Sequence, residues 1–489
     1  MTDSIPRLAV ADETTELLGT GSAEADSSAT IEIMAEEAKR LAGASTPVIA
    51  SYVLQYGFGF ISLVFVGRIG ADELAAAALA NMALVVAVYS PGVGLASALD
   101  TFCSTAFTAS PDQTLVGFHL QRGLIAAASL AAAAVPVLWY LEPLLLLLRQ
   151  DPAVAALCGM YTRIQLLGVL PWLFFECVKR FLQAQGIMHA STYVLVAVTP
   201  VHLAGSYFLT ISPRLGAGMA GAAAANALTN WLLLTGIVAY VRWSKAWAAW
   251  GGWSAQALWA MPQYLYLAVP STIMVCAEWW ILDLLALAAS YLGSVPLAAQ
   301  SIIINTCSIA YQVPDGLSMA VCNRVGNLIG QAQPRRAKLA AWLGISLGAA
   351  VGAAAFCAGL AVRGWWGRVY SDDRQVAACV AAIMPACAAF QMLDSVNSVG
   401  SGVLRSLGRQ NAGAAINFSA YYAIGFPLGL YLTYGAPRAG LVGLWYGLCA
   451  GVALAVACQL LLCVRIRWRT EVDRCQALVS RDRELQAGA

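Results

Sequence analysis

Long apolar stretches, separated by short polar breaks or by breaks containing Gly or Pro, recur along almost the whole chain. A helix needs about 20 predominantly apolar residues to cross the hydrocarbon core of a bilayer. Twelve stretches reach this length, at 46–66, 74–108, 120–141, 154–178, 189–211, 217–241, 263–290, 297–323, 339–362, 376–404, 412–434 and 440–464. The pattern therefore predicts an all-α polytopic membrane protein with twelve transmembrane helices.

The polar segments divide the chain further. Residues 1–45 are acidic and polar and lack the basic and then apolar pattern of a cleavable signal peptide, so we expect a mostly disordered tail that stays on the protein. Residues 242–262 form a linker whose tryptophans suit a belt at the membrane interface. The predicted units are thus a six-helix lobe at 46–241, a second at 263–467, and a C-terminal tail at 468–489.

The two predicted lobes repeat each other at a shift of about 222 to 225 residues. Three matches occur in the same order: 70–76 with 293–299, 180–185 with 405–410, and 218–221 with 440–443. Six helices per half give both halves the same orientation, related by a pseudo-two-fold axis along the membrane normal. Proteins built in this way bind their cargo between the lobes, so we expect the functional site there.

Composition agrees with a membrane protein, because 60% of the residues are hydrophobic and only 11% are charged, against roughly 25% charged in a soluble domain. If the N-terminus is cytosolic, sixteen Lys and Arg residues near the helices fall on the cytosolic side and seven on the other. Cytoplasmic loops carry the excess of Lys and Arg. We therefore predict that both termini are cytosolic.

Cysteine and histidine give no sign of a metal centre or an enzyme. The thirteen cysteines lie mostly in apolar runs without a C-x-x-C motif, and His119, His189 and His202 are scattered. A membrane-embedded transferase would need His, Asp or Glu clusters in its loops, and the loops here are short and lack them. We expect no cofactor, no metal, no enzymatic activity, no nucleic-acid partner, and a monomer.

Ionisable residues within the predicted helices are candidate functional residues, because each costs about 2.5 to 3.5 kcal/mol on insertion scales. Glu278 lies midway along its helix with no charge in the preceding turns, and Asp394 lies between Gln391 and Asn397 on a polar stripe. These two are the leading candidate functional residues, with a buried structural hydrogen-bond network as the alternative. The other members of the group are Asp100, Glu142, Arg163, Glu176, Asp283 and Asp315. For Glu176 we expect a pair with Arg180.

Polar stripes predict which helix faces look into a cavity. Ser301, Asn305, Ser308, Gln312 and Asp315 follow one face of the eighth helix, and Ser51, Gln55 and Ser62 form a sparser stripe on the first. In a bilayer such faces must look at protein or water, although small polar residues also join helices together. Asp283 lies about 140° around the helix from Glu278, so the two cannot share a face unless the helix unwinds.

Several motifs resemble those of eukaryotic multidrug and toxic compound extrusion transporters. They are Leu54-Gln55-Tyr56, Val66–Gly70, Glu73–Ala76, Gly94–Thr101, Glu278-Trp279-Trp280, Pro296–Ser301, Arg324–Asn327 and Ser401–Arg405. The resemblance covers nearly all of 41–468 and implies a two-lobed antiporter that exports organic cations, xenobiotics or metabolites, driven by a proton or sodium gradient. It assigns coupling to Glu278 and Asp394 and makes Asp283 the second acid of its helix. Together with the stripes, it predicts substrate contacts at Asp283, Gln55, Asn305, Gln312, Tyr311, Trp279 and Asn397.

One departure from that family concerns the end of the second helix. A usual Cys-Gly-Gln-Ala-Phe-Gly pattern is replaced by Cys103-Ser-Thr-Ala-Phe-Thr108, which puts close helix packing at this point in doubt. An exporter or flippase of lipid-linked or anionic cargo is the alternative function. It would line its cavity with Arg and Lys, for which only Arg163 is a candidate.

The N-terminal tail contains a candidate address. Glu13 is followed by Leu17 and Leu18, a spacing that resembles the acidic dileucine signal read by adaptor complexes delivering proteins to vacuoles or lysosomes. The vacuolar membrane and the plasma membrane are the two locations we consider, and a disordered tail without a signal is the alternative interpretation.

Overall fold

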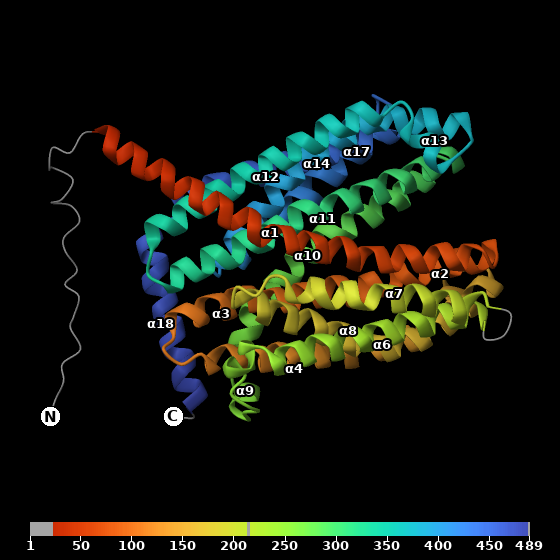
Figure 1. The fold of residues 1–489 in the computed structure, drawn as a ribbon. Helices are drawn as coiled ribbons and strands as arrows, with labels where there is room; N and C mark the ends of the chain where they lie inside the picture. The colour runs from red at the N-terminus through yellow and green to blue at the C-terminus, as the bar shows by residue number, and fades with distance from the viewer. Residues whose placement is uncertain (1–22, 213–215, 488–489) are drawn as a thin grey trace, which may run out of the picture.

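The computed structural model describes residues 23–212 and 216–487, and it consists of helices arranged in two lobes (Figure 1). The first lobe comprises α1 (Ala23–Gly67), α2 (Ala71–Leu84), the π-helical segment η2 (Val85–Tyr89), α3 (Ser90–Ala109), α4 (Thr114–Trp139), α5 (Leu141–Leu147), α6 (Pro152–Ala184), α7 (Ala190–Thr210) and α8 (Gly218–Trp243). A linker with the short helices η3 (Lys245–Ala249) and α9 (Gln256–Trp259) follows.

The second lobe has the same plan. It comprises α10 (Met261–Ser290), α11 (Ser294–Gly330), α12 (Pro334–Val362), α13 (Trp366–Tyr370), α14 (Arg374–Ser406), α15 (Gln410–Phe418), the π-helical segment η4 (Ser419–Gly425), α16 (Phe426–Tyr434) and α17 (Leu441–Arg465). A last helix, α18 (Trp468–Ala487), leaves the bundle and lies across one end of it (Figure 1). We refer to this end as the α18 end.

Twelve helical runs match the twelve predicted stretches. In the described part of the chain, ten runs are long and apolar enough to cross a membrane, and α11 and the α15–η4–α16 run complete the set. The polar face of α11 explains its lower hydropathy. Helices suit a bilayer because they satisfy their own backbone hydrogen bonds. The first helix begins at Ala23 rather than near residue 46, so part of the predicted tail is helical.

The lobes meet at the α18 end and diverge at the other (Figure 1). One large cluster of buried apolar residues joins both lobes and α18 at the α18 end, with members such as Leu99, Val325 and Val403. Towards the opposite end each lobe has its own cluster, around Tyr161 in the first lobe and around Trp445 in the second. The shared core holds the lobes together at one end, and the separate cores leave space between them at the other.

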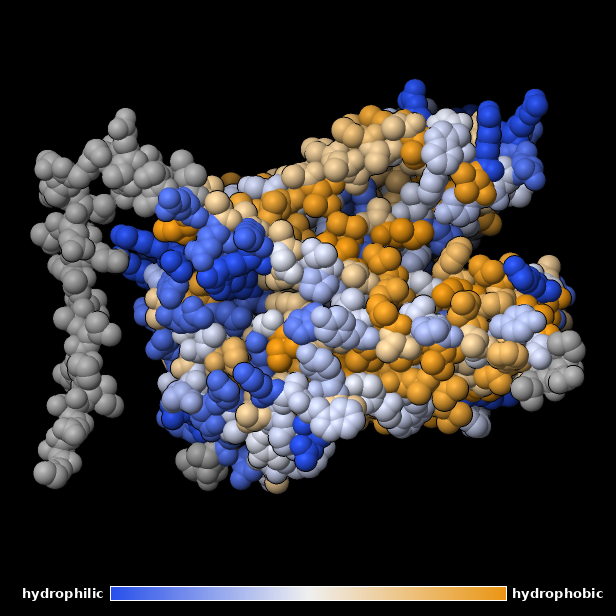
Figure 2. All heavy atoms as spheres, viewed as in Figure 1, coloured by the Kyte–Doolittle hydropathy of each residue, from blue (hydrophilic) through white to orange (hydrophobic). Residues whose placement is uncertain are grey.

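The surface has the pattern of a protein embedded in a bilayer. Hydrophobic residues cover the flanks of the helices, and hydrophilic residues gather at the α18 end (Figure 2). In the linker at this end, Trp243, Trp253 and Trp259 are largely exposed, and the Arg242 guanidinium lies 4.9 Å from the centre of the Trp247 ring. Tryptophan and basic residues in this arrangement are typical of the boundary between lipid and water.

Candidate functional site

A cavity of about 540 Å³ lies between the two lobes. Its walls come from α1, α2, η2, α3, α6 and α8 of the first lobe and from α10, α11 and α14 of the second. Figure 2 shows the molecule hollowed between the lobes at the end away from α18. The cavity is large enough for a small organic molecule.

Four carboxyl groups of the second lobe line the cavity. Glu278 and Asp283 lie on α10, Asp315 lies on α11 and Asp394 lies on α14. Asp394 lies close enough to Glu278 and Asp315 to interact with their charges, and Glu278 also interacts with Asp315. Three helices therefore gather negative charge in one wall.

Two tyrosines accompany the central acids. The Tyr311 hydroxyl faces the Glu278 carboxyl, and the Tyr421 hydroxyl donates a hydrogen bond to Asp394 Oδ1 at 3.5 Å. Glu278 Oε1 is buried without a hydrogen-bond partner among the described residues. A buried carboxyl with an unused oxygen atom can hold a proton or contact a cation.

The polar stripes of α11 and α14 follow the cavity wall. On α11 the stripe residues Asn305, Ser308, Gln312 and Asp315 line it. Ser301 does not, because it is exposed at the start of the helix and donates to the Leu297 carbonyl. On α14 the lining residues are Gln391, Asp394, Ser398 and Ser401. The spacing of polar residues on these helices thus identified the faces that meet the cavity.

Most of the predicted site residues are brought together in this cavity. The lining includes Gln55, Glu278, Trp279, Asp283, Asn305, Tyr311, Gln312 and Asp394. Asn397, which we predicted to contact substrate, does not line it. Its amide donates to the Tyr421 hydroxyl at 3.2 Å and accepts from Gln459 at 2.9 Å, so Asn397 packs behind Asp394. The i+3 spacing placed Asn397 on the same polar stripe as Asp394. It could not show that other helices cover Asn397 and separate it from the cavity.

Asp283 and Glu278 both line the cavity although α10 is an unbroken helix across them. On this regular helix the two residues lie on different faces, as expected, yet both reach the cavity. Because α10 runs from the α18 end towards the open end, Asp283 lies nearer the mouth than Glu278. A cavity that widens around α10 towards its mouth reaches both side chains.

The wall of the first lobe contains a compact ionic network. Lys179 Nζ lies 2.7 Å from Glu176 Oε1 and donates to Gln55 Oε1 at 3.1 Å. The Gln55 amide donates to the same Glu176 oxygen at 2.7 Å, and Lys179 lies 4.7 Å from the centre of the Tyr52 ring. The partner of Glu176 is thus Lys179, and the predicted pair of Glu176 with Arg180 is wrong. On one helix Glu176 can pair with Lys179 at i+3 or with Arg180 at i+4. Gln55 of the neighbouring α1 contacts both Glu176 and Lys179 and so favours the first pair.

Arg180 instead closes the bottom of the cavity. Its Nη1 lies 2.5 Å from Asp100 Oδ2, and both side chains are buried. Beside this pair, the Thr101 hydroxyl donates to the Arg405 carbonyl at 2.5 Å, and the Gln410 amide donates to the Thr101 hydroxyl at 2.7 Å. Thr101 belongs to the first lobe and Arg405 and Gln410 to the second, so these bonds cross between the lobes.

The cationic residues that line the cavity do not include Arg163, the candidate predicted from the sequence. Arg163 forms an ion pair with Glu142 at 2.8 Å and does not line the cavity. Lys179, Arg180 and Arg405 line it instead. The internal repeat was the available signal, because it aligns Arg180 of the first half with Arg405 of the second.

Helices α3 and α11 pack closely below the cavity, despite the departure from the family pattern in α3. A methyl group added to Gly326 would meet the Ser104 hydroxyl at 2.1 Å, and one added to Gly330 would meet the Thr108 hydroxyl at the same distance. The Thr108 hydroxyl also donates to the Asn327 carbonyl at 2.9 Å. Glycines on α11 therefore permit the close approach where α3 carries larger residues.

Residues 23–212 and 216–487 contain no group of three or more His, Cys, Asp or Glu side chains arranged to hold a metal ion. The cavity is lined by carboxyl, amide, hydroxyl and cationic side chains. Such groups can bind and release protons or small charged molecules.

The sequence model of the MatE family matches this chain twice, over residues 47–208 and 270–431. The two matched ranges begin at 47 and 270, which are 223 residues apart, in agreement with the internal repeat. Each range falls within one lobe.

Individual proteins show the same similarity. An uncharacterised transporter of Schizosaccharomyces pombe is 36% identical over 87% of this chain and 78% of its own length. The multidrug and toxin extrusion protein 2 of Mus musculus is 32% identical over 90% of this chain and 76% of its own. The crystal structure of the eukaryotic MATE transporter AtDTX14 superimposes with a TM-score of 0.85 at 26% identity, over 91% of this chain and all of that one.

Proposed function

Because this chain belongs to the MATE family of multi-pass membrane transporters, and is not an enzyme, we propose that it is an antiporter that exports organic cations in exchange for protons. The cavity between its lobes is the transport site. The main support is the group of four carboxyl groups on one wall, Glu278, Asp283, Asp315 and Asp394.

The charge balance of the cavity favours a cationic cargo. Lys179 is paired with Glu176 and Arg180 with Asp100. In the part of the chain that the structure describes, the ion pairs within 4.0 Å involve none of the four second-lobe carboxyl groups. A cation entering from the open end therefore meets acids without ionic partners.

Exchange follows from exclusive occupancy of Glu278 and Asp394. A carboxylate that holds a proton no longer attracts a cation, so proton and cargo compete for the same groups. Protons from the acidic side release the cargo, the lobes then rock to open the α18 end, and deprotonation there restores affinity. One pH unit supplies about 1.4 kcal/mol per proton, enough for a roughly tenfold gradient of a monovalent cargo.

Sodium is the alternative coupling ion. Carboxylates together with amide oxygens also suit a hard cation, and Gln391 and Asn305 line the same cavity. The same carboxyl groups would then alternate between sodium and cargo.

The proposed orientation puts the α18 end and both termini in the cytosol. The excess of Lys and Arg on that side supports it, and so do the exposed tryptophans of the linker. In this orientation the cavity opens to the extracellular space or to the lumen of a vacuole. An acidic compartment on that side supplies the protons.

Anionic cargo is the second candidate, and the presence of Lys179, Arg180 and Arg405 in the lining is the observation that favours it. Two of these three cations are already ion-paired within the protein. An anion would have to displace Glu176 or Asp100, whereas a cation displaces no ionic partner from the second-lobe acids. We therefore favour organic cations.

Purified protein in lipid vesicles provides the test. With an acidic interior, a fluorescent organic cation added outside should accumulate, and collapsing the proton gradient with an ionophore should stop accumulation. The same vesicles with an internal sodium gradient at equal pH distinguish sodium coupling. Accumulation of an organic anion but not of the cation would contradict the proposal.

A further inference from the structure

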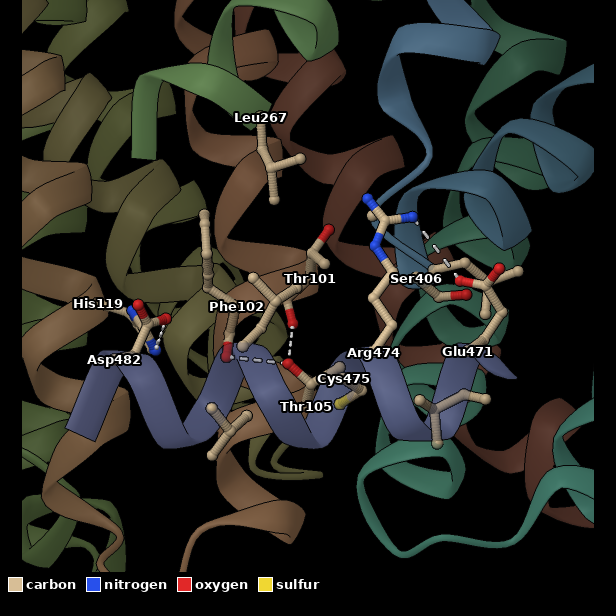
Figure 3. Close-up of a pocket in the computed structure, with 15 residues that line it drawn as sticks. Thr101, Phe102, Thr105, His119, Leu267, Ser406, Glu471, Arg474, Cys475 and Asp482 are labelled. Carbon is tan, nitrogen blue, oxygen red and sulfur yellow. Dashed lines mark hydrogen bonds and ion pairs between the residues drawn. The ribbon is translucent and has the colours of Figure 1, made fainter. Parts of the chain in front are cut away.

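Helix α18 lies across the line where the two lobes meet. It follows α17, so the chain joins it to the second lobe, yet it packs against α3 and α4 of the first lobe as well as α11 and α12 of the second. Figure 3 shows α18 passing beneath Thr105 and His119 of the first lobe and Ser406 of the second. The helix therefore bridges both lobes at the closed end.

One face of α18 is built for this position. Its buried residues recur at intervals of three and four and are Trp468, Glu471, Val472, Cys475, Val479 and Asp482. This spacing forms a single stripe on a helix. The apolar members belong to the core cluster that the two lobes share at this end. The remaining face, with Arg469, Asp473 and Arg483, is exposed.

The two buried acids of this stripe hold different lobes. The Arg409 guanidinium, between α14 and α15 of the second lobe, donates to Glu471 from Nε at 3.0 Å. Eleven residues later, about 16 Å along the helix, Asp482 lies 3.5 Å from Arg122 and 3.6 Å from His119 of the first lobe. Each acid is thus an anchor for one lobe.

The first-lobe anchor is well buried. Arg122 and Asp482 are at most 2% exposed, and Arg122 also donates to the Ala260 carbonyl at 3.3 Å and lies 4.8 Å from the centre of the Phe102 ring. Near the end of α18, the Gln486 amide donates to the Thr114 hydroxyl at 3.0 Å. Separating these groups leaves a buried charge without its partner, which is costly.

We propose that α18 is a strap that holds the lobes closed at the α18 end, and that its release from the first lobe is a necessary step when this end opens. The inference rests on the alternating-access cycle of the proposed function. When the lobes part at this end, Arg409 and Arg122 move apart. A helix joined to the second lobe cannot then keep Asp482 beside Arg122, so the Asp482 contact opens in each cycle.

A reversible cross-link tests the strap. The Thr105 hydroxyl faces the Cys475 thiol, so Thr105→Cys places two thiols side by side, one on the first lobe and one on α18. Oxidation should join them and abolish transport in vesicles, and reduction should restore it. Thr105→Cys combined with Cys475→Ser is the control and should transport equally before and after oxidation. The proposal would be overturned if the cross-linked protein transported at the same rate as the protein with reduced thiols.

A second readout does not depend on transport. Fluorophores attached through non-natural amino acids at the exposed positions Asp112 of the first lobe and Lys338 of the second report the separation of the lobes. Deleting residues 468–489 should shift this distance to larger values, and Asp482→Asn should shift it in the same direction by less. An unchanged distance in both variants would overturn the strap. If the two variants show larger lobe separations but the protein with reduced thiols does not transport the cation, the result contradicts the proposed function and leaves the strap intact.

Discussion

Acidic residues inside the membrane fall into two groups that differ in their partners. Asp100 pairs with Arg180, Glu142 with Arg163 and Glu176 with Lys179. Glu278 and Asp394 have tyrosine and amide neighbours in place of a cation. A paired carboxylate has a structural reason to be in the membrane, whereas an unpaired one needs a ligand or a proton. Substitution of Glu278 or Asp394 should therefore affect transport directly.

We expect Glu278→Gln to abolish proton-driven uptake while the protein still folds and inserts. Gln has the same size and can still meet the Tyr311 hydroxyl, but it cannot exchange a proton. Losing one coupled proton at a gradient of one pH unit removes about 1.4 kcal/mol, so accumulation of a monovalent cation should fall about tenfold. Uptake in vesicles at several pH values measures the effect.

Glu142→Gln is the matched control. Glu142 also lies within the membrane-facing part of the chain, but it pairs with Arg163 and does not line the cavity. Its uptake should keep the pH dependence of the unmodified protein. Normal pH-dependent uptake by the Glu278 variant would remove this residue from the mechanism.

Helix α3 of the first lobe packs closely against α11 of the second lobe near the α18 end. Ser104 and Thr108 occupy positions where the family pattern has glycine, and each faces a glycine of α11. The two glycines of α11 keep the helix axes close although α3 has larger residues at these positions. Interhelical contacts in membranes depend on such small residues.

Gly326→Ala should weaken this closure, because the added methyl group would meet the Ser104 hydroxyl. Overpacking of this kind costs about 1 to 3 kcal/mol. We expect a lower transport rate and lower thermal stability. Adding Ser104→Gly, which returns the glycine to α3, should restore both.

Gly205→Ala on α7 is the control for this exchange, since a methyl group there meets nothing within 4 Å. It should leave transport and stability nearly unchanged. Failure of Ser104→Gly to rescue the alanine variant would show that the α3–α11 contact is not the cause.

At the scale of the whole molecule, two lobes share one core at the α18 end and have separate cores at the other. In the proposed transport cycle, a hinge near the shared core lets the cavity change the side on which it opens with little change inside either lobe. The direction of transport then depends on the membrane in which the protein resides and on which side is acidic.

We predict that the candidate address in the N-terminal tail selects this membrane. Glu13, Leu17 and Leu18 lie outside the described residues, and their role stays a sequence-based prediction. Replacing Leu17 and Leu18 with Ala in a tagged protein should move it from the vacuolar membrane to the cell surface, as seen by fluorescence microscopy. Unchanged localisation would contradict the signal, and a double substitution of the nearby Thr14 and Thr15 serves as control.

The order of residues alone specifies the helices and their two-fold repetition. Apolar length fixes where a helix can cross a bilayer, and the spacing of polar residues on α11 and α14 fixes which face meets water or protein. Glu278 could be singled out because no charge lies in the preceding turns of its helix, and Asp394 because it lies on a polar stripe. These are local properties, which the order of residues contains directly.

The partners of the buried polar side chains could be identified only from the folded structure. Lys179 rather than Arg180 neutralises Glu176 because Gln55 of α1 lies beside it, and Arg180 meets Asp100, which is 80 residues away in the chain. Asn397 is covered because Gln459 and Tyr421 pack against it. The role of α18 depends on Arg122, which lies 360 residues from Asp482. Such contacts join distant parts of the chain, and periodicity along one helix carries no information about them.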